Sequence, residues 1–269
     1  MRKKRYAEIG LGGRSDTYYE ALSTKFTDIC ELVAFCDINQ TRMNFANEQI
    51  IKLGGIAVPT YKEYEFEKML NETKPDILII TTVDCYHHEY IIKGLEFGCE
   101  IITEKPMAID ADGCNAIMEA EKRTGNKVNV TFNCRFMPFV KRVKELLNGG
   151  IIGDVLNVDF EWLLDTSHGA DYFRRWHCNK KNSGGLLVHK ATHHFDMVNW
   201  WINQEPVKVY ANGSRGFYGP TRKERGERCL TCQYKQKCEF AFSKTDDPRM
   251  QGIYFKAENE DGYYRDRCV

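Results

Sequence analysis

The most restrictive feature of this chain is a regular alternation of strand-like and helix-like segments over its first half. The strand-like runs cover residues 6–9, 31–36, 76–82, 100–103 and 127–132, and the helix-like runs cover 14–26, 41–53, 64–71, 88–97 and 110–124. A strand, a helix and a further strand make up the unit from which parallel sheets are built. Because such crossovers keep one hand, the alternation predicts an α/β fold with a doubly wound parallel sheet.

The pattern changes after about Asn133. Residues 139–148 and 186–202 are typical of helices, whereas 154–164 and 207–213 are typical of strands, and the chain beyond residue 214 is polar and rich in glycine, cysteine and aromatic residues. A length of 269 residues fits two domains. We therefore expect one domain over residues 1–125 and a second over residues 126–269.

The charge balance argues against several kinds of partner. The chain has 38 Lys and Arg and 38 Asp and Glu, so its formal net charge is zero, which favours neither nucleic acid nor a membrane surface as a partner. No run of about 18 apolar residues is present, and no apolar stretch follows the basic residues 2–5 as it would in a signal peptide. We expect a cytoplasmic protein with neither partner.

A glycine-rich turn follows the first strand. Gly10, Gly12 and Ser15 have the spacing of a dinucleotide-binding turn in which serine replaces the third glycine. The first glycine permits the tight turn, the second lets backbone amides approach a pyrophosphate, and the next helix points its N-terminus at the anion. Asp37 follows the second strand, where a carboxylate accepts hydrogen bonds from ribose hydroxyls and repels a 2′-phosphate. The turn predicts NAD, with NADP less favoured, bound by residues 1–125; the alternatives are a structural loop and a helix-capping role for Asp37.

A lysine stands at the end of a later strand. Lys105 lies between Glu104 and Pro106, directly after the strand-like run 100–103. Ligands of open α/β sheets bind at the carboxyl ends of the strands. A lysine there can hydrogen-bond a substrate hydroxyl and stabilise a developing alkoxide by its charge. We therefore expect Lys105 to be catalytic, the alternative being a surface turn that the proline fixes.

Histidines gather in the helix-like run 186–202. His189, His193 and Asp196 are spaced so that they share one helix face. Such a face suits proton transfer, because the unperturbed pKa of histidine lies near neutrality. It would also suit a metal with further ligands from elsewhere, or a polar face packed against the first domain. We expect His193 to act as general acid or base, with Asp196 orienting it.

Taken together, these motifs resemble one family. The marks are residues 10–15, Asp37, 82–87, Glu104-Lys105-Pro106, 133–136 and Gly184-Gly185 followed by His193 and Asp196. They resemble the Gfo/Idh/MocA oxidoreductases over nearly the whole chain. The resemblance implies an N-terminal Rossmann domain and a second α+β domain, for substrate and oligomerisation, built on an open, mostly antiparallel sheet. It also implies NAD or NADP as cofactor and a sugar or cyclitol as substrate.

The resemblance also assigns roles to residues. Lys105 resembles the family lysine that contacts the nicotinamide side and the substrate, and His193 resembles the general acid or base. The family carries an aspartate four residues before that histidine, where this chain has His189. Cofactor contacts are expected from Gly10, Gly12, Gly13, Arg14, Ser15, Asp37, Thr82, His87, Glu104 and Lys105. Substrate contacts are expected from Arg135, Trp176, His177, His189, Lys190 and Asp196.

The expected reaction moves a hydride between NAD and a hydroxyl-bearing carbon of a sugar or cyclitol. Family members are longer than this chain, so we expect an incomplete second domain, and a homo-oligomer when the protein is full length. Two alternatives remain open: a glycoside hydrolase that retains its NAD and acts by transient oxidation and elimination, and a non-catalytic sensor that binds NAD.

Four of the eleven cysteines form a group of their own. Cys229 and Cys232 have Cys-x-x-Cys spacing, with Cys238 and Cys268 further on. Thiolates at such spacing bind zinc or an iron–sulfur centre, and basic neighbours favour the thiolate form. The group therefore predicts a structural metal site that holds an irregular segment, with unligated thiols and disulfides as alternatives.

Overall fold

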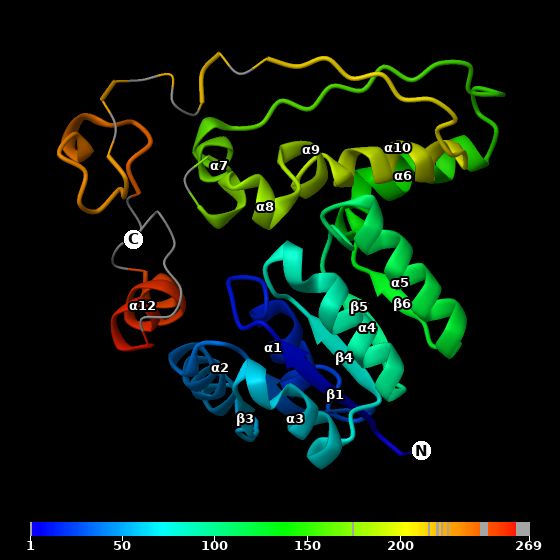
Figure 1. Ribbon diagram of the computed structural model, residues 1–269. Coiled ribbons are helices and arrows are strands. Elements are labelled where there is room, and N and C mark those ends of the chain that lie inside the picture. Colours follow the sequence, from blue (N-terminus) through cyan, green and yellow to red (C-terminus); the bar gives the residue numbers. More distant parts are fainter. Residues whose placement is uncertain are drawn as a thin grey trace.

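The fold was analysed in a computed structural model (Figure 1). It describes residues 2–173, 175–214, 216–218, 221, 223–224, 226–242 and 247–261. Within these residues, a parallel sheet with helices on both faces carries a layer of further helices above one of its edges (Figure 1).

Six strands form the sheet. They are β1 Lys4–Ile9, β2 Cys30–Cys36, β3 Thr60–Tyr61, β4 Ile77–Ile80, β5 Glu100–Thr103 and β6 Val128–Val130. The order across the sheet is β3-β2-β1-β4-β5-β6, and every neighbouring pair is parallel. This confirms the predicted doubly wound sheet, which reverses its order between β1 and β4 and so creates the place where ligands of such sheets bind. β6 continues the sheet past residue 125, so the boundary expected there stays a proposal.

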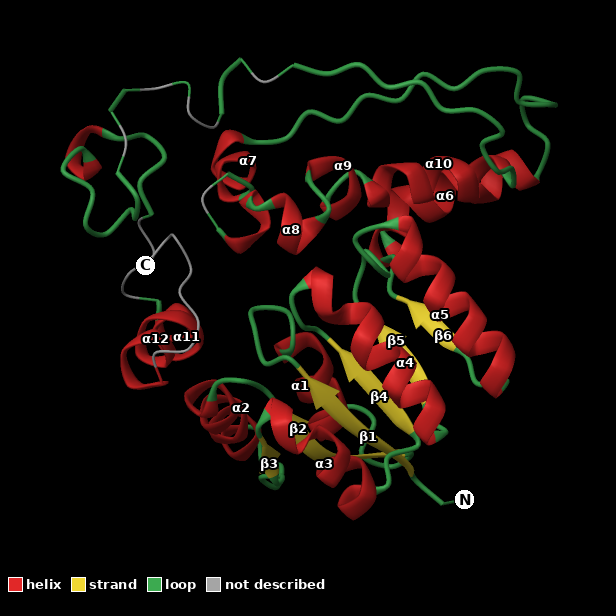
Figure 2. Ribbon diagram, in the orientation of Figure 1, coloured by secondary structure: helices red, strands yellow, loops and turns green. Residues whose placement is uncertain are grey.

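Helices cover both faces of the sheet (Figure 2). They are α1 Asp16–Thr24 and α2 Gln40–Lys52 on one face, and α3 Phe66–Thr73, α4 His87–Phe97 and α5 Ala111–Thr124 on the other. Because side chains alternate along a strand, Ala7 and Ile9 pack against the second group. All four residues of β4 are buried, as expected for a central strand covered on both sides.

The second layer lies above the carboxyl ends of the strands (Figure 1). Its helices are α6 Pro138–Asn148, α7 Thr166–Asp171, α8 Lys180–Ser183, α9 Leu186–His189 and α10 Thr192–Ile202. α6 and α10 pack through Val140 and Met197, with Trp200 and Trp201 alongside. This small apolar cluster holds the layer together and leaves α7 to α9 over the edge of the sheet.

The long helix predicted over residues 186–202 is broken in two. α9 ends at His189 and α10 begins at Thr192. In a continuous helix the amide of His193 would donate to the carbonyl of His189, but it donates to Lys190 at 3.3 Å. The carbonyl of His189 instead accepts from Nζ of Lys105 at 2.8 Å. A tertiary contact with the first domain therefore replaces one helical hydrogen bond.

Neither segment predicted as a strand in the second half forms one. Residues 154–164 and 207–213 are without helix or strand, and the described part of the chain contains a single sheet. Leu156 and Tyr210 are 95% and 90% exposed. An isolated strand pair needs further strands or a packed face to be stable, and here no apolar layer covers these side chains. The expected antiparallel sheet is thus not formed by the described residues.

The end of the described chain returns to the first domain. α11 Pro248–Met250, η6 Gln251–Phe255 and α12 Lys256–Asp261 lie against α2 (Figure 1). Asn39 Nδ2 donates to the carbonyl of Ala257 at 3.0 Å, and Arg42 Nε donates to that of Ile253 at 2.8 Å. We call residues 247–261 the returning segment; the sequence pattern had predicted only an irregular polar stretch there.

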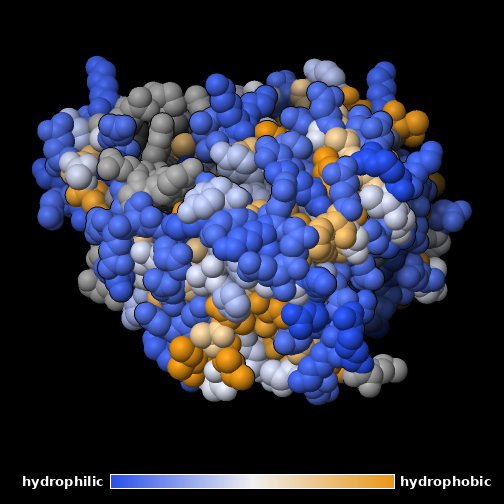
Figure 3. Space-filling model, turned by 60° about the horizontal axis from the view of Figure 1, so that its bottom comes forward, coloured by the Kyte–Doolittle hydropathy of each residue, from blue (hydrophilic) through white to orange (hydrophobic). Residues whose placement is uncertain are grey.

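The surface seen from the lower end of the molecule is mostly hydrophilic, with apolar patches between hydrophilic side chains (Figure 3). Among the described residues, every helix is too short or too polar to cross a bilayer.

Candidate active site

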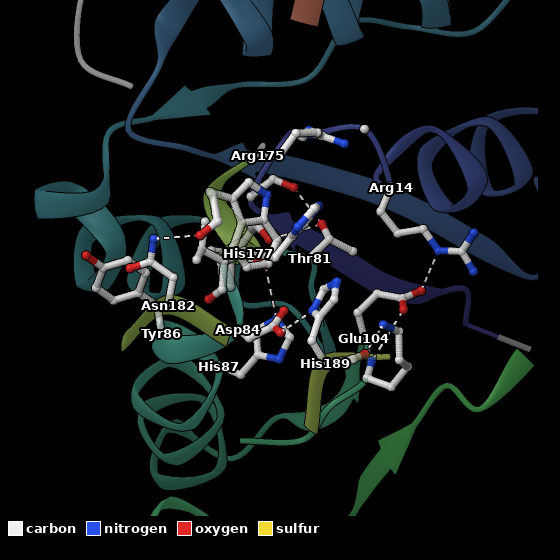
Figure 4. Close-up of a pocket in the computed structure, with 18 of the residues that line it drawn as sticks. Arg14, Thr81, Asp84, Tyr86, His87, Glu104, Arg175, His177, Asn182 and His189 are labelled. Atoms are coloured by element: carbon white, nitrogen blue, oxygen red, sulfur yellow. Dashed lines mark hydrogen bonds and ion pairs between the residues drawn. The ribbon is translucent and has the colours of Figure 1, made fainter. Parts of the chain in front are cut away.

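A cavity of about 830 Å³ opens where the sheet meets the helical layer. Its walls come from the glycine turn, from the loops after β4 and β5, from residues between α7 and α10, and from the returning segment. Figure 4 shows side chains of the glycine turn, of the ends of β4 and β5 and of the helical layer converging on it. Its volume lies within the range of small-molecule sites.

The glycine turn has the shape that a pyrophosphate requires. Gly10 has a φ of +89°, and a Cβ there would lie 2.6 Å from the amide nitrogen of Thr82, so only glycine fits. A Cβ at Gly12 would meet nothing within 4 Å. The turn therefore leaves open the space that the second glycine of a dinucleotide site provides. Ser15 is buried and does not border the cavity. Its hydroxyl donates to the carbonyl of Gly12 at 2.9 Å, which shapes the turn.

Asp37 connects the turn to the end of β2. Its Oδ2 accepts from the amide of Leu11, and its Oδ1 accepts from the amide of Asn39 at 2.7 Å. The carboxylate is buried at the cavity edge, and burial raises its pKa while Arg42 opposes that rise. The acid thus fixes the turn and still borders the cavity, where a ribose would lie.

Arg14 and Glu104 join the glycine turn to the end of β5 (Figure 4). Arg14 Nε donates to Oε1 of Glu104 at 2.6 Å, and the hydroxyl of Tyr18 donates to the same oxygen at 2.8 Å. Burial and the Glu104 charge raise the pKa of Tyr18. Glu104 is therefore held in place beside Lys105, the residue that follows it.

Lys105 is held between the two layers. Burial lowers the pKa of its ammonium group, and Asp84 and Glu104 partly offset that effect. Next to it, both ring nitrogens of His87 lie near carbonyl oxygens, Nδ1 2.7 Å from Pro106 and Nε2 3.1 Å from Thr82. His87 thereby connects the loop after β4 with the loop that carries Lys105.

His189 is paired with a carboxylate from the first domain. Nδ1 of His189 lies 2.6 Å from Oδ2 of Asp84, which belongs to η2 Asp84–Tyr86 directly after β4 (Figure 4). Asp84 is 3% exposed. Burial raises the pKa of Asp84 to about 7, whereas burial and the charge of Lys105 lower the pKa of His189 to about 3. Both groups therefore resist ionisation.

His193 lacks such a partner. The residue is 7% exposed, and its Nδ1 is buried without a hydrogen-bond partner among the described residues. Its ring meets the edge of Phe132, with centroids 6.2 Å apart. Burial, followed by the charges of Lys105 and Lys190, lowers the pKa of His193 to about 3.

Aromatic rings form one wall of the cavity. His177 stacks on His189 with ring centroids 4.9 Å apart, and Trp176 and Tyr172 meet His189 edge-on at 5.3 and 5.6 Å. Burial lowers the pKa of His177 to about 3, so it adds a neutral ring to the wall. These rings give the cavity one aromatic wall.

Most of the expected site residues border the cavity. They are Gly10, Gly12, Gly13, Arg14, Asp37, Thr82, His87, Glu104, Lys105, Trp176, His177, His189, Lys190 and His193. Arg135 and Asp196 are not part of its wall and pair with each other, Nε to Oδ2 at 2.7 Å. Asp196 therefore orients the arginine in this structure, and its expected contact with His193 is not formed.

The cysteine group is not assembled as a metal site in the described residues. Cys229, Cys232 and Cys238 are free and half-buried, and no three metal-ligating side chains converge within the described ranges. Cys268 lies outside those ranges. The four-cysteine site remains a prediction.

Asp84, Arg249 and Tyr254 are among the residues of the site that were not singled out from the sequence. Asp84 follows a strand at its carboxyl end, a position that could have marked it. Arg249 and Tyr254 of the returning segment also border the cavity, and Arg249 donates to the carbonyl of Gly13 and pairs with Asp16 at 2.5 Å. No local signal in the sequence indicates that these two residues face the glycine turn.

Comparison with known proteins agrees with this arrangement. Residues 4–132 match the GFO_IDH_MocA model "Oxidoreductase family, NAD-binding Rossmann fold", and residues 144–245 match "Oxidoreductase family, C-terminal alpha/beta domain". YteT of Bacillus subtilis is 39% identical over 238 residues, which cover 86% of this chain and 55% of YteT. The inositol 2-dehydrogenase/D-chiro-inositol 3-dehydrogenase of Lactiplantibacillus plantarum is 24% identical over 205 residues, which cover 76% of this chain and 53% of that protein.

A solved structure shares the fold. The WlbA dehydrogenase from Chromobacterium violaceum, in complex with NADH and UDP-GlcNAcA, superposes with a TM-score of 0.63 and 26% identity, covering 75% of this chain and 56% of that one. This chain spans about half the length of the curated relatives it matches.

Proposed function

Because this chain belongs to the Gfo/Idh/MocA oxidoreductase family, we propose that it binds NAD and oxidises a hydroxyl-bearing carbon of a sugar or cyclitol, or reduces the corresponding carbonyl. The observation that carries the proposal is a convergence. The ammonium group of Lys105 and the imidazoles of His189 and His193 border the same cavity as the open glycine turn.

The residues present fit the cofactor. The space over Gly12 is free for a pyrophosphate, and Asp37 borders the place of a ribose. NAD, when bound, supplies the acceptor or donor of the hydride. A carboxylate beside the ribose disfavours a 2′-phosphate, which supports NAD over NADP.

The side chains around the cofactor site have separate proposed roles. Lys105 is proposed to hold the reacting oxygen and to stabilise the negative charge that develops on it. The lysine is aligned by its bond to the carbonyl of His189, so its position depends on contact between the two layers. The family resemblance assigns the proton to His193, and His189 offers a second imidazole on the same wall. The neutral rings of Trp176 and His177 suit an uncharged polyol.

The test separates cofactor binding from chemistry. NAD affinity is measured by calorimetry and turnover by NADH absorbance, with myo-inositol, scyllo-inositol and methyl glucoside as substrates. Gly12→Ala is expected to weaken NAD binding about tenfold or more, because its methyl group enters the pyrophosphate space. Lys105→Met is expected to lower kcat about 100-fold or more while NAD binding changes little. Lys181→Met, at an exposed lysine outside the cavity, is the control.

The outcomes also separate the alternatives. If Gly12→Ala leaves NAD affinity unchanged, the cofactor site is misplaced. NAD binding without oxidation of any polyol would favour the sensor. Release of nitrophenol from a nitrophenyl glycoside with no net NADH would favour the NAD-retaining glycoside hydrolase.

Three further expectations remain proposals. One is the cytoplasmic location expected from the sequence itself. Another is the homo-oligomer that the resemblance implies for the full-length protein, which is tested by sedimentation. The metal site of Cys229, Cys232, Cys238 and Cys268 is tested by elemental analysis of the purified chain. One zinc per chain, or iron with labile sulfide, would support that site, and absence of both would reject it.

A further inference from the structure

The structure supplies a carboxylate where the sequence appeared to lack one. The family pattern has an aspartate four residues before His193, and this chain has His189 there. Asp84, 105 residues earlier in the chain, places its carboxylate 2.6 Å from Nδ1 of His189. Both residues border the cavity.

This pair is a built arrangement. Asp84 is almost fully buried, and the side chain of His189 is 12% exposed. His177 stacks on the His189 ring, Trp176 meets it edge-on, and Lys105 holds the backbone carbonyl of the same residue. The ring is therefore held by aromatic contacts, by a hydrogen bond at one nitrogen and through its backbone. Nε2 is the ring nitrogen left for a ligand of the cavity.

The pair has two relevant protonation states. In its protonated form, one proton lies between Asp84 and Nδ1 of His189, and a second proton is on Nε2. Loss of the second proton leaves an ionised carboxylate that accepts from Nδ1–H, and Nε2 then carries a lone pair. Because the two groups share a proton, the pair titrates as one unit. The carboxylate stabilises the form that has just taken up a proton, as it does in other Asp–His pairs.

Within the described ranges, His193 lacks a partner that would stabilise its protonated ring. Its Nδ1 is buried with no hydrogen-bond partner in the described part of the chain, so the positive charge of a protonated ring there would be unsupported. Lys105 and Lys190 oppose a positive charge on His189 and on His193 alike, so the two rings differ in their hydrogen-bond partners. The two imidazoles border one cavity, but among the described residues only His189 has a carboxyl group as hydrogen-bond partner.

We propose that Asp84 and His189 form the proton-accepting dyad of this site, in which Nε2 of His189 takes the hydroxyl proton of the substrate and Asp84 is a positioning residue. The inference rests on the proposed function. The substrate O–H bond breaks and its proton goes to Nε2, while the C–H hydrogen leaves with its electron pair as hydride to oxidised NAD, and a carbonyl forms. His193 then contributes a hydrogen bond to the substrate.

The charges around the dyad set its pH range. Lys105, Lys190, His87, Arg175 and His177 face His189 from the elements packed around it. The cations favour the deprotonated pair, whereas burial of Asp84 and the nearby charge of Glu104 favour the protonated one. Oxidation needs the deprotonated dyad, so kcat/KM for the alcohol is expected to rise with pH through about 7 and then level off.

The first experiment measures which ring nitrogen of His189 carries the proton, without substrate or cofactor. The whole chain is labelled with ¹⁵N-histidine, and long-range ¹H–¹⁵N spectra are recorded between about pH 5 and 9. The His189 signals are assigned by their loss in His189→Gln. At high pH we expect His189 to carry its proton on Nδ1, facing Asp84. In Asp84→Asn the amide no longer fixes this tautomer, so the proton is expected to move to Nε2 in a large share of molecules.

The second experiment compares the two imidazoles during turnover of the best polyol substrate. His189→Gln is expected to lower kcat about 100-fold or more and to abolish the rise in rate near pH 7. His193→Gln is the matched control; it is expected to raise KM and to keep the pH profile. Asp84→Asn is expected to lower kcat more than it raises KM.

The outcomes decide between the dyad and its rival. A proton on Nε2 of His189 in the unmodified chain at high pH would overturn the proposal. So would a pH profile that survives in His189→Gln and disappears in His193→Gln. If no polyol is oxidised, the proposed function fails, whereas the tautomer measured in the first experiment still decides whether the pair exists.

Discussion

At the scale of single residues, the most unusual side chain outside the cavity is Glu8. It lies fully buried in β1, and its Oε2 has no hydrogen-bond partner among the described residues. Thr81 donates to the other oxygen over a long 3.4 Å. Burial raises the pKa of Glu8 well above its ordinary value of 4.5, because a charge there would be poorly solvated. The strand therefore holds a neutral acid.

This burial predicts a pH-dependent gain for Glu8→Gln. The folded chain keeps a proton that the unfolded chain releases above about pH 4.5, so the stability of the unmodified chain falls as pH rises above that value. Glutamine does not ionise, so the stability of the variant does not fall in this way. The two proteins should have similar urea midpoints near about pH 4, and the variant should gain up to about 1.4 kcal/mol for each pH unit above it. Exposed Glu20→Gln is the control; an equal gain in both variants would contradict the interpretation.

Alanine substitutions at Gly10 and Gly12 should have different effects on stability. Alanine at Gly10 requires a left-handed backbone and places Cβ 2.6 Å from the backbone of Thr82, so Gly10→Ala should lower stability by about 1–3 kcal/mol as well as NAD affinity. Alanine at Gly12 meets open space and should lower NAD affinity alone. Thermal unfolding and calorimetry on both variants check this, and equal stability losses would show that the turn differs from the one described.

At the scale of elements, local patterns predicted the first half well and the second half poorly. The five predicted strands and five helices up to Phe132 are all present, because each buries a periodic apolar face against the same sheet. The break after His189 depends on a carbonyl taken by Lys105 from the other layer. Residues 154–164 alternate like a strand but lack the neighbours that would make them one. Periodicity indicates which secondary structure a segment can form, but the segment forms it only where a neighbouring strand or layer packs against it.

The returning segment leads to a prediction about packing. Gly252 lies in η6 against Phe45 of α2, and a Cβ there would fall 2.2 Å from the ring. Gly252→Val should weaken docking of the segment by about 1–3 kcal/mol through this overlap. Hydrogen exchange of residues 247–261 should rise while exchange in β1 and β4 stays slow.

NAD affinity should fall in the same variant, because Arg249 and Tyr254 then leave the cavity wall. Gly213→Val is the matched control, since a Cβ at that position meets nothing within 4 Å. Unchanged exchange in Gly252→Val would mean that the segment is not held as described.

At the scale of the whole molecule, the site depends on contacts that no local pattern contains. Doubly wound topology was enough to bring Gly10, Asp37 and Lys105 to one edge of the sheet, since the carboxyl ends of parallel strands share that edge. It was not enough for Asp84 and His189, which are 105 residues apart, or for Arg249 and Gly13, which are 236 apart. These pairs form only once the helical layer and the returning segment dock, and docking depends on shape and burial across the whole molecule.

The same dependence predicts how the molecule responds to NAD. Several separate parts of the chain border the cavity, so one bound molecule should protect all of them together. At an NAD concentration about 100 times Kd, linkage predicts a gain of about 2.7 kcal/mol in stability. Hydrogen exchange should slow in residues 10–13, in 82–87 and 104–106, in 186–193 and in 247–254, with little change in α5 on the far face. Gly12→Ala should reduce every one of these changes at the same NAD concentration, and for a tenfold loss of affinity the gain in stability should fall to about 1.4 kcal/mol. Protection limited to residues 10–13 would mean that the helical layer and the returning segment do not share a site with the glycine turn, and Lys105 would then lack the alignment that its bond to His189 provides.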